Sequence, residues 1–394
     1  MGKKIRIGIL YGGKSGEHQV SITTAYSVIR SFDFSKYEVV PFYITQQGEW
    51  RSAGMLTAPV EDKQLLIIEE TAVGRAGSAL DDVFGSAADV PLFGQGVGQV
   101  TVSVSALADG KHVNGESANE AALDLVLPLL HGTFGEDGTV QGLLEMANVP
   151  YVGAGVLASA VGMDKVMMKK LFAAAGLPQC VYRHFTRTDW LKNRDEHVLE
   201  IEVSLGYPCF VKPANLGSSV GISKASNQAE LLDAVEFAFR YDRKVVVEEF
   251  VDAREIEVGI LGNDEPRASV CGEIVSSNDF YDYHAKYIDG KSAMVIPAQL
   301  PAALSEQIRS MAVQAFQAID GSGLSRVDFF LRKEDNELLI NEINTMPGFT
   351  PYSMYPLLWK ETGVSYSELL DELIGLALER HVAKQQIDYG FEVP

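Results

Sequence analysis

The sequence has few cysteines, a deficit of basic residues and no apolar run of membrane-spanning length. Its cysteines, Cys180, Cys209 and Cys271, are far apart and lack the spacing of metal ligands. An odd and sparse set of this kind is typical of reduced thiols in the cytosol. The chain carries 33 Lys and Arg against 53 Asp and Glu, a formal net charge of −20. This charge argues against a nucleic acid or an anionic membrane as a partner.

The first residues of the chain give no sign of targeting. Residues 1–6 precede an apolar run that is too short, and too interrupted by glycine, for a signal peptide. Arg6 stands where a myristoylation signal would have Ser or Thr. We therefore expect a cytoplasmic protein. Its 394 residues, 46% apolar and 22% charged, predict an ordinary globular chain of two or three domains.

An apolar segment near the start predicts a buried parallel strand over residues 5–11. Gly12 and Gly13 predict a tight turn, and apolar residues on one face predict a helix from Ser15 onward. A strand, a glycine turn and a helix in this order typically open an α/β domain. Glu17 would then fall in the first helical turn, where the helix dipole favours a carboxylate.

The same segment matches the phosphate-loop pattern letter by letter. Residues 8–15 read Gly, four residues, then Gly-Lys-Ser. However, Gly8 lies inside the apolar run rather than at the start of a loop, and the remaining Gly-Gly pair is too short to wrap two phosphates. We therefore discount a P-loop.

Two further apolar segments, 39–44 and 125–130, predict the next strands of this domain. Residues 52–120 have weak periodicity, and we interpret them as a surface elaboration without chemistry. His131 ends the second of these strands and opens a glycine-rich turn. Ligands bind at the carboxyl ends of strands in α/β domains. A structural and a functional role for His131 therefore both stay open.

A helix predicted over 157–175 carries Met163-Asp164-Lys165, and a strand over 207–213 follows it and contains Lys212. The next segment, 215–222, is rich in glycine and serine, and its amides and hydroxyls could close over phosphates. A strand over 244–251 leaves acidic residues at its end, which could contact an adenine and a ribose.

Three segments complete the predicted C-terminal half. Residues 254–261 predict the start of another sheet, and residues 366–381 predict an amphipathic helix. Residues 280–287 hold three Tyr and a Phe without a clean period, which favours a lid or specificity loop over a core segment.

The most informative feature is a predicted hairpin of strands 325–331 and 338–344. If it turns about Asp335, Asp328 faces Glu342 and Arg326 faces Asn344. Glu342 and Asn344 project from the same face, about 6–7 Å apart. Two carboxylates and an amide oxygen, with no Cys or His nearby, suit Mg²⁺ rather than Zn²⁺. Magnesium beside a cation usually serves phosphates. A solvated polar face is the alternative interpretation.

The strand with Lys212, the loop 217–221, the strand end 248–251 and the hairpin together resemble the ATP-grasp superfamily, in which two subdomains clamp ATP. The segments 12–21, 131–132, 163–165, 283–287 and 344–348 look like the D-alanine–D-alanine ligase family, and the resemblance covers residues 4–378. It implies an α/β fold, in which an N-terminal Rossmann-like domain of mainly parallel sheet is followed in the sequence by an ATP-grasp clamp. The implied domains are 1–152, which binds substrate; 153–250, the central subdomain; and 251–394, the C-terminal subdomain with the metal site.

The resemblance also implies roles for residues that match the family's motifs. Those implied for ATP are Lys165, Lys212, Gly217, Ser219, Glu248, Glu249, Phe250, Val251 and Glu255. Those implied for two Mg²⁺, which Mn²⁺ could replace, are Asp328, Glu342 and Asn344. The implied catalytic residues are Glu17, Ser218, Tyr287, Arg326 and Gly348. The implied substrate-binding residues are Val20, Ser21, His131, Lys286, Ser353 and Met354.

The implied reaction is the ATP-dependent joining of two D-alanines through a D-alanyl phosphate, with release of ADP and phosphate, for peptidoglycan precursors. The family also implies a homodimer. Three alternatives remain at this stage. They are a sister ligase that joins D-alanine to D-lactate or D-serine, another ATP-grasp carboxylate–amine ligase, and a nucleotide-binding regulatory protein without catalysis. A complete metal triad argues against the last.

Overall fold

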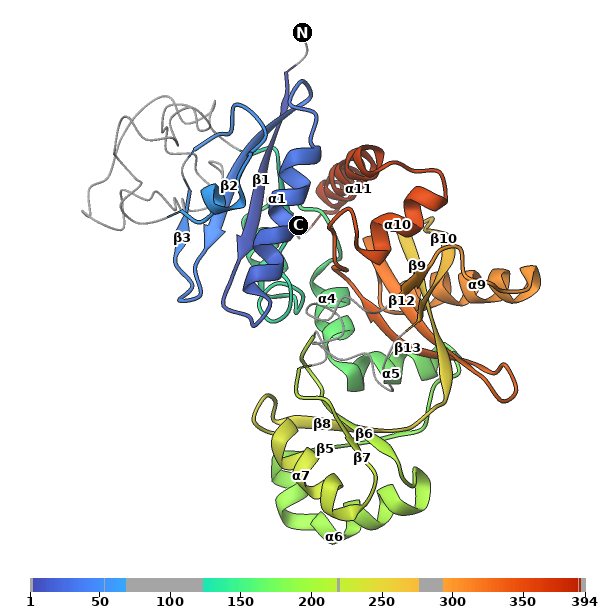
Figure 1. The fold of residues 1–394 in the computed structure, drawn as a ribbon. Helices are drawn as coiled ribbons and strands as arrows, with labels where there is room; N and C mark the ends of the chain where they lie inside the picture. The colour runs from blue at the N-terminus through green and yellow to red at the C-terminus, as the bar shows by residue number, and fades with distance from the viewer. Residues whose placement is uncertain are drawn as a thin grey trace, which may run out of the picture.

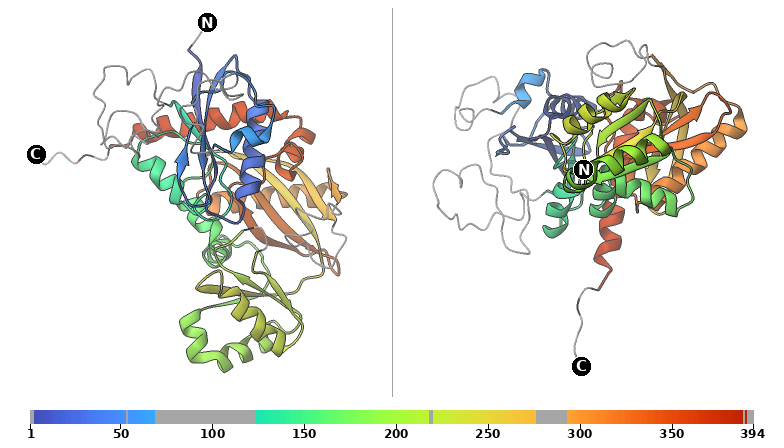
Figure 2. Two further views of the ribbon diagram at one scale, coloured as in Figure 1. Left: turned by 60° about the vertical axis from the view of Figure 1, so that its left-hand side comes forward. Right: turned by 90° about the horizontal axis from the view of Figure 1, so that it is seen from below.

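The computed structural model describes residues 3–52, 54–68, 123–217, 220–275, 293–388 and 390. In these residues three sheets follow one another along the chain, each with helices packed on it (Figure 1). The middle sheet and its helices project from the rest of the molecule (Figure 1 and Figure 2). None of the helices in the described ranges is long and apolar enough to cross a membrane.

The N-terminal sheet has the order β3-β2-β1-β4. Its strands are β1 (Ile5–Gly12), β2 (Tyr37–Ile44), β3 (Trp50–Arg51) and β4 (Leu125–Pro128), and its other elements are α1 (His18–Ser31), the short η1 (Lys63–Leu66) and α3 (Thr139–Met146). The central strand β1 pairs in parallel with β2 and β4, which confirms the predicted parallel arrangement. Gly8 lies inside β1, as the argument against a P-loop required.

One expectation for this domain is wrong. Helix α1 begins at His18 rather than Ser15, so Glu17 is the residue that precedes the helix and not part of its first turn. The reason lies in Ser15, whose hydroxyl donates to the carbonyl oxygen of His131 at 2.6 Å. This contact ties residue 15 to the loop after β4, and the helix starts beyond it.

The middle sheet is antiparallel with the order β5-β8-β6-β7. Its strands are β5 (Tyr182–Thr186), β6 (Cys209–Pro213), β7 (Ser223–Ala225) and β8 (Lys244–Glu249). Helices α6 (Arg187–Ser204) and α7 (Gln228–Ala238) cover one face and bury Trp190, Leu231 and Val235 against it (Figure 1). The other face is the one turned toward α5 and the C-terminal sheet.

The C-terminal sheet is antiparallel with the order β11-β10-β9-β12-β13. Its strands are β9 (Ala253–Gly262), β10 (Arg267–Val275), β11 (Ala293–Val295), β12 (Gly323–Arg332) and β13 (Leu338–Asn344). The accompanying helices are α9 (Ala302–Ala318), α10 (Met354–Glu361) and α11 (Tyr366–Gln385). The last helix runs past the predicted end at His381 and joins the core of the N-terminal sheet through Leu373 and Ile374.

The predicted helix over 157–175 is in fact two helices, α4 (Val156–Met163) and α5 (Lys165–Ala174). Asp164 separates them because its carboxylate accepts hydrogen bonds from the amides of Val166 and Met167 at 3.0 and 3.1 Å and so caps α5. Both helices share a core with the C-terminal sheet. The three sheets fall within the three predicted segments, and the exact domain boundaries stay a prediction.

Arg380 in α11 holds the C-terminal helix to the segment that leaves the N-terminal sheet. Its guanidinium donates to the carbonyl oxygens of Tyr151, at 2.9 Å, and Gly153, and to the hydroxyl of Ser322. The guanidinium also lies 4.4 Å from the centre of the Tyr151 ring. One side chain therefore connects three segments that are distant in the sequence.

We predict that Arg380→Met lowers the free energy of unfolding by about 1–3 kcal/mol, because it leaves buried carbonyl oxygens without donors. Denaturant unfolding of the purified variant measures this loss. Glu379→Met, at the neighbouring exposed position of the same helix, is the control and should unfold like the wild type. Equal stability of the two variants would contradict the role given to Arg380.

Candidate active site

The β12–β13 hairpin brings the predicted metal ligands together in the predicted register. Asp328 pairs with Glu342, and Arg326 pairs with Asn344. The pairing shifts by one residue between Asp328 and Phe329, which leaves Asn341 as the extra residue of a β-bulge. Without this bulge Asp328 would face Asn341 instead. The sequence predicted the outcome of the pairing but not the bulge that produces it.

A third carboxylate belongs to the same row. Glu257 of β9 pairs with Asp328 on its other side, so carboxylates occupy neighbouring positions on three adjacent strands. Arg326 neutralises part of this charge, because its guanidinium lies 2.7 Å from both oxygens of Asp328 and 2.9 Å from Glu257. Burial disfavours the charged guanidinium, but the carboxylates of Asp328 and Glu257 outweigh it and raise the pKa of Arg326. We did not predict Glu257. The signal that could have found it is the alternation of Glu255 and Glu257 with apolar residues.

The donor atoms of this row fit a hard cation. Asp328 and Glu342 supply carboxylate oxygens, and the side-chain amide of Asn344 lies 3.0 Å from Asp328. Here the amide nitrogen donates to Asp328, and a half-turn of the amide would present its oxygen to a cation instead. Oxygen donors of this kind match Mg²⁺. In the described part of the chain no group of three or more His, Cys, Asp or Glu has metal-site geometry. The set of Asp328, Glu342 and Asn344 includes only two carboxylates, and its role in metal binding stays a prediction.

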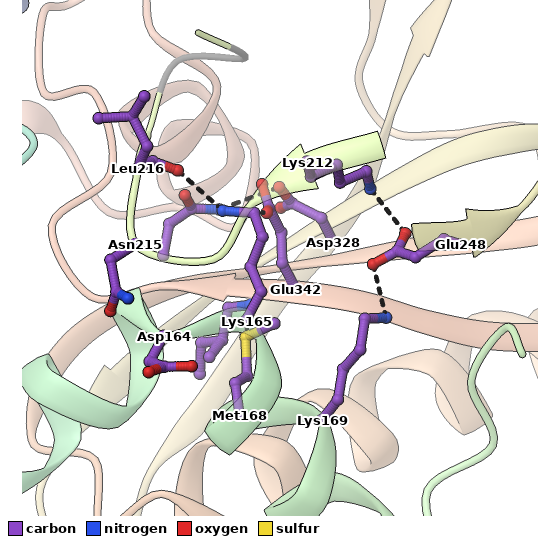
Figure 3. A network of polar contacts seen from close by, with 12 residues as sticks. Asp164, Lys165, Met168, Lys169, Lys212, Asn215, Leu216, Glu248, Asp328 and Glu342 are labelled. Carbon is purple, nitrogen blue, oxygen red and sulfur yellow. Dashed lines mark hydrogen bonds and ion pairs between the residues drawn. The ribbon is translucent and has the colours of Figure 1, made fainter. Parts of the chain in front are cut away.

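Lys165, the first residue of α5, connects this hairpin to the loop that follows β6. Its ammonium donates to the carbonyl oxygen of Leu216 at 2.8 Å and lies 3.8 Å from the carboxylate of Glu342 (Figure 3). Asp164, which caps the same helix, also forms an ion pair with Lys244 of β8. The start of α5 is therefore held between the middle sheet and the β12–β13 hairpin.

A second cluster of charged side chains surrounds Glu248 of β8. The carboxylate of Glu248 accepts from Lys212 of β6 at 2.7 Å and lies 3.1 Å from the ammonium of Lys169 in α5 (Figure 3). Burial opposes ionisation of Glu248, but the two lysines outweigh it and lower its pKa to about 2. Lys169 was missed at the sequence level, because nothing in the pattern separated it from an ordinary helix lysine.

Four further residues implied for ATP lie at the end of β8 or near the start of β9. The carboxylate of Glu249 accepts from the amide of Val181 at 2.7 Å. The ring of Phe250 is 39% exposed, and the ammonium of Lys224 lies 4.9 Å from its centre. Val251 follows Phe250 and is half-buried, as is Glu255 on β9.

Glu17 lies where loops from the N-terminal and middle sheets meet. A Cβ atom added to Gly132 would stand 2.6 Å from a carboxylate oxygen of Glu17, and one added to Gly217 would stand 3.1 Å from it. Gly132 also has a φ of 75°, which favours glycine, whereas a side chain at position 217 would require only a small shift of Glu17. Glu136, which we did not predict, accepts from the Gly132 amide at 2.5 Å. Burial and then the charge of Glu17 raise the pKa of Glu136 well above its usual range.

Two of the predicted substrate-binding residues have mainly structural contacts. His131 is buried, and its Nε2 lies 3.1 Å from the hydroxyl of Thr24. Burial lowers the pKa of this imidazole, so the neutral form is favoured. Ser21 is fully buried, accepts from the Gly12 amide at 2.8 Å and donates to the Leu129 carbonyl at 2.5 Å.

The segment after β13 provides the remaining predicted residues. A Cβ atom on Gly348 would stand 3.2 Å from the hydroxyl oxygen of Ser353, so the two lie close together. That oxygen also accepts from the Thr350 amide at 3.1 Å. Met354 begins α10 and is buried.

A cavity of about 580 Å³ brings most of these side chains together. The predicted residues that line it are Glu17, Val20, His131, Lys165, Gly217, Arg326, Glu342, Asn344, Gly348, Ser353 and Met354. Its lining also includes Glu136 and Glu257. The group around Glu248 is not part of this lining. Ser218, Ser219, Lys286 and Tyr287, with the whole aromatic segment 280–287, lie outside the described residues.

Comparison with known proteins finds one family over nearly the whole chain. The family described as "D-ala D-ala ligase N-terminus" matches residues 6–154, and "D-ala D-ala ligase C-terminus" matches residues 171–375. A D-alanine–D-alanine ligase of Bacillus licheniformis is 53% identical over 98% of this chain and 100% of its own length. One from Listeria monocytogenes is 49% identical over 99% and 100%.

Solved structures give the same picture. The D-alanine–D-alanine ligase from Coxiella burnetii is 31% identical, with a TM-score of 0.74 over 98% of this chain and 97% of that one. The VanG D-Ala:D-Ser ligase from Enterococcus faecalis is 34% identical, with a TM-score of 0.75 over 95% and 100%. These structures have the ATP-grasp fold expected from the sequence. The chain therefore belongs to the D-alanine–D-alanine ligase family.

Proposed function

We propose that this protein joins two D-alanine molecules to D-alanyl-D-alanine with ATP, and that it supplies peptidoglycan precursors. The observation that supports this most is the cavity, where Glu17, Lys165 and Arg326 converge from three parts of the chain. A carboxylate can bind the ammonium of an amino acid. One cation can bind the phosphates of the phosphoryl donor, and another can stabilise a developing oxyanion. The names of the relatives at about 50% identity favour D-alanine as the second substrate.

In the first step the carboxylate of one D-alanine attacks the γ-phosphorus of ATP. The bond to ADP breaks, and D-alanyl phosphate forms. The carboxylate of Glu17 accepts hydrogen bonds from the ammonium of this D-alanine, while Lys165 and Lys212 bind the phosphates. Positioning and charge stabilisation supply most of the catalysis in phosphoryl transfer. These lysines would supply positive charge to ATP in a chain whose net charge is −20.

Asp328, Glu342 and Asn344 would hold two Mg²⁺, or Mn²⁺ in their place. When bound, the metal ions would neutralise the negative charge of the phosphates. In the structure Asp328 is held by Arg326 at 2.7 Å. A cation held by Asp328 would compete with Arg326 for this carboxylate, and the guanidinium would then be available to the substrate.

In the second step the amine of the other D-alanine attacks the acyl carbon, and phosphate leaves as the peptide bond forms. Arg326 and the amide of Gly348 would stabilise the oxyanion of the tetrahedral intermediate. Ser353 and Met354 would contact the second carboxylate. From their sequence positions, we assign Ser218 and Tyr287 to closing the site with Glu17, and Lys286 to substrate binding. Closure would keep water from the acyl phosphate.

The remaining assignments follow the same scheme. The purine and ribose of ATP would be bound by Glu248, Glu249, Phe250, Val251 and Glu255, with Gly217 and Ser219 closing over the phosphates. The N-terminal domain, 1–152, would carry the first substrate, and the segments 153–250 and 251–394 would form the clamp. We also propose a cytoplasmic homodimer.

The product assay decides the function. We expect that purified protein with ATP, Mg²⁺ and D-alanine forms D-alanyl-D-alanine and one phosphate for each dipeptide, as measured by mass spectrometry and phosphate release. Equal D-serine and D-lactate are added in competition. A dipeptide with serine or an ester with lactate as the main product would replace the proposal with a sister ligase. ATP binding without D-alanine-dependent phosphate release would indicate a non-enzymatic protein.

The metal assignment predicts that Glu342→Gln, which keeps the side-chain shape and removes the charge, lowers kcat about a hundredfold or more at saturating Mg²⁺. The thermal midpoint should change little, because Glu342 is only half-buried. Glu334→Gln in the exposed turn of the same hairpin is the control and should keep full activity. Near-normal turnover of folded Glu342→Gln would remove Glu342 from the site.

A further inference from the structure

Lys169 is one of the most deeply buried large side chains of the described protein, with 1% of its surface exposed. An ammonium in such a place requires an anionic partner, because the cost of removing its hydration is large. Glu248 provides this partner at 3.1 Å. The thiol of Cys180 lies 3.9 Å from the ammonium, and the centre of the Tyr182 ring lies 5.5 Å from it.

Glu248 divides its two oxygens between two lysines. Oε1 lies 3.1 Å from Lys169, and Oε2 accepts from Lys212 at 2.7 Å (Figure 3). One carboxylate thus balances two ammonium groups, and the cluster has one positive charge in excess. This excess favours an anionic ligand at the cluster.

The two lysines differ in what surrounds them. Lys169 extends from the interior of α5, and its own carbonyl accepts from the Gln179 side chain at 2.8 Å, which ties the helix to the next segment. Lys212 stands near the end of β6, directly before the loop that leads to Gly217. Lys212 is therefore the lysine that can turn toward a ligand under this loop, and Lys169 is the one that stays.

We propose that Lys169 is a positioning residue for nucleotide binding. It keeps Glu248 charged and in place, so that Lys212 can exchange Glu248 for a phosphate of ATP without leaving a buried carboxylate unpaired. The proposal rests on the proposed function, which places Lys212 on phosphate and Glu248 at the purine. Lys169 would contact neither ATP nor D-alanine, and it would act through Glu248 and Lys212.

Removal of the Lys169 charge makes Lys212 the main counter-ion of Glu248. ATP must then compete with Glu248 for Lys212. We expect Lys169→Met to raise the Kd for ATP with Mg²⁺, measured by calorimetry without D-alanine, by about tenfold or more. At saturating ATP, kcat should stay within about threefold of wild type, because the loss concerns binding before the reaction. Lys170→Met, at the adjacent exposed position, is the control and should bind ATP normally.

A second comparison separates this role from general packing. If Lys169 acts through Glu248, Lys169→Met should weaken ATP binding no further in a Glu248→Gln background, within about twofold. The same tenfold loss in both backgrounds would overturn the proposal, as would wild-type affinity of Lys169→Met. Should the single variant not fold, a tenfold loss on adding Lys169→Met to Glu248→Gln would still overturn the proposal. Failure of the wild type itself to bind ATP would instead refute the proposed function.

Discussion

The register of β12 against its two neighbours is the constraint on which the site depends. It aligns Glu257, Asp328 and Glu342 across three strands and places Arg326 two pairs further along, on the same face. A shift of one residue moves every side chain of a strand to the opposite face. The bulge at Asn341 sets Asp328 opposite Glu342 while the strand still pairs down to the turn. The helices and the other two sheets present their own residues to this row.

Charge balance is the second principle of the site. Its buried ions are paired within the protein: Arg326 with Asp328 and Glu257, Lys165 with Glu342, and Lys169 and Lys212 with Glu248. Arg326, Lys165, Lys169 and Lys212 are thereby held where a polyanionic substrate would need cations. In the proposed reaction each ligand replaces a protein partner. Binding then changes which ions are paired, while the charges themselves stay buried and compensated.

The sequence predicted the parts of the fold in which local pattern decides. The hairpin pairing of Asp328 with Glu342 followed from alternation and a polar turn, and β1 from an apolar run before two glycines. The helix break at Asp164 was missed, because capping depends on backbone geometry that the apolar pattern does not show. Lys169 was missed for a related reason. A lysine in an amphipathic helix usually faces water, and only the fold shows that this one is buried against Glu248.

A crystal structure with Mg²⁺ and a non-hydrolysable ATP analogue tests the exchange of partners most directly. We expect the Lys212 ammonium to leave Glu248 and contact a phosphate oxygen, while Lys169 stays at about 3 Å from Glu248, a normal charged hydrogen bond. Arg326 should lose at least one of its contacts with Asp328 in the same structure. An occupied site in which Lys212 still binds Glu248, or in which Lys169 has left Glu248, would contradict this account.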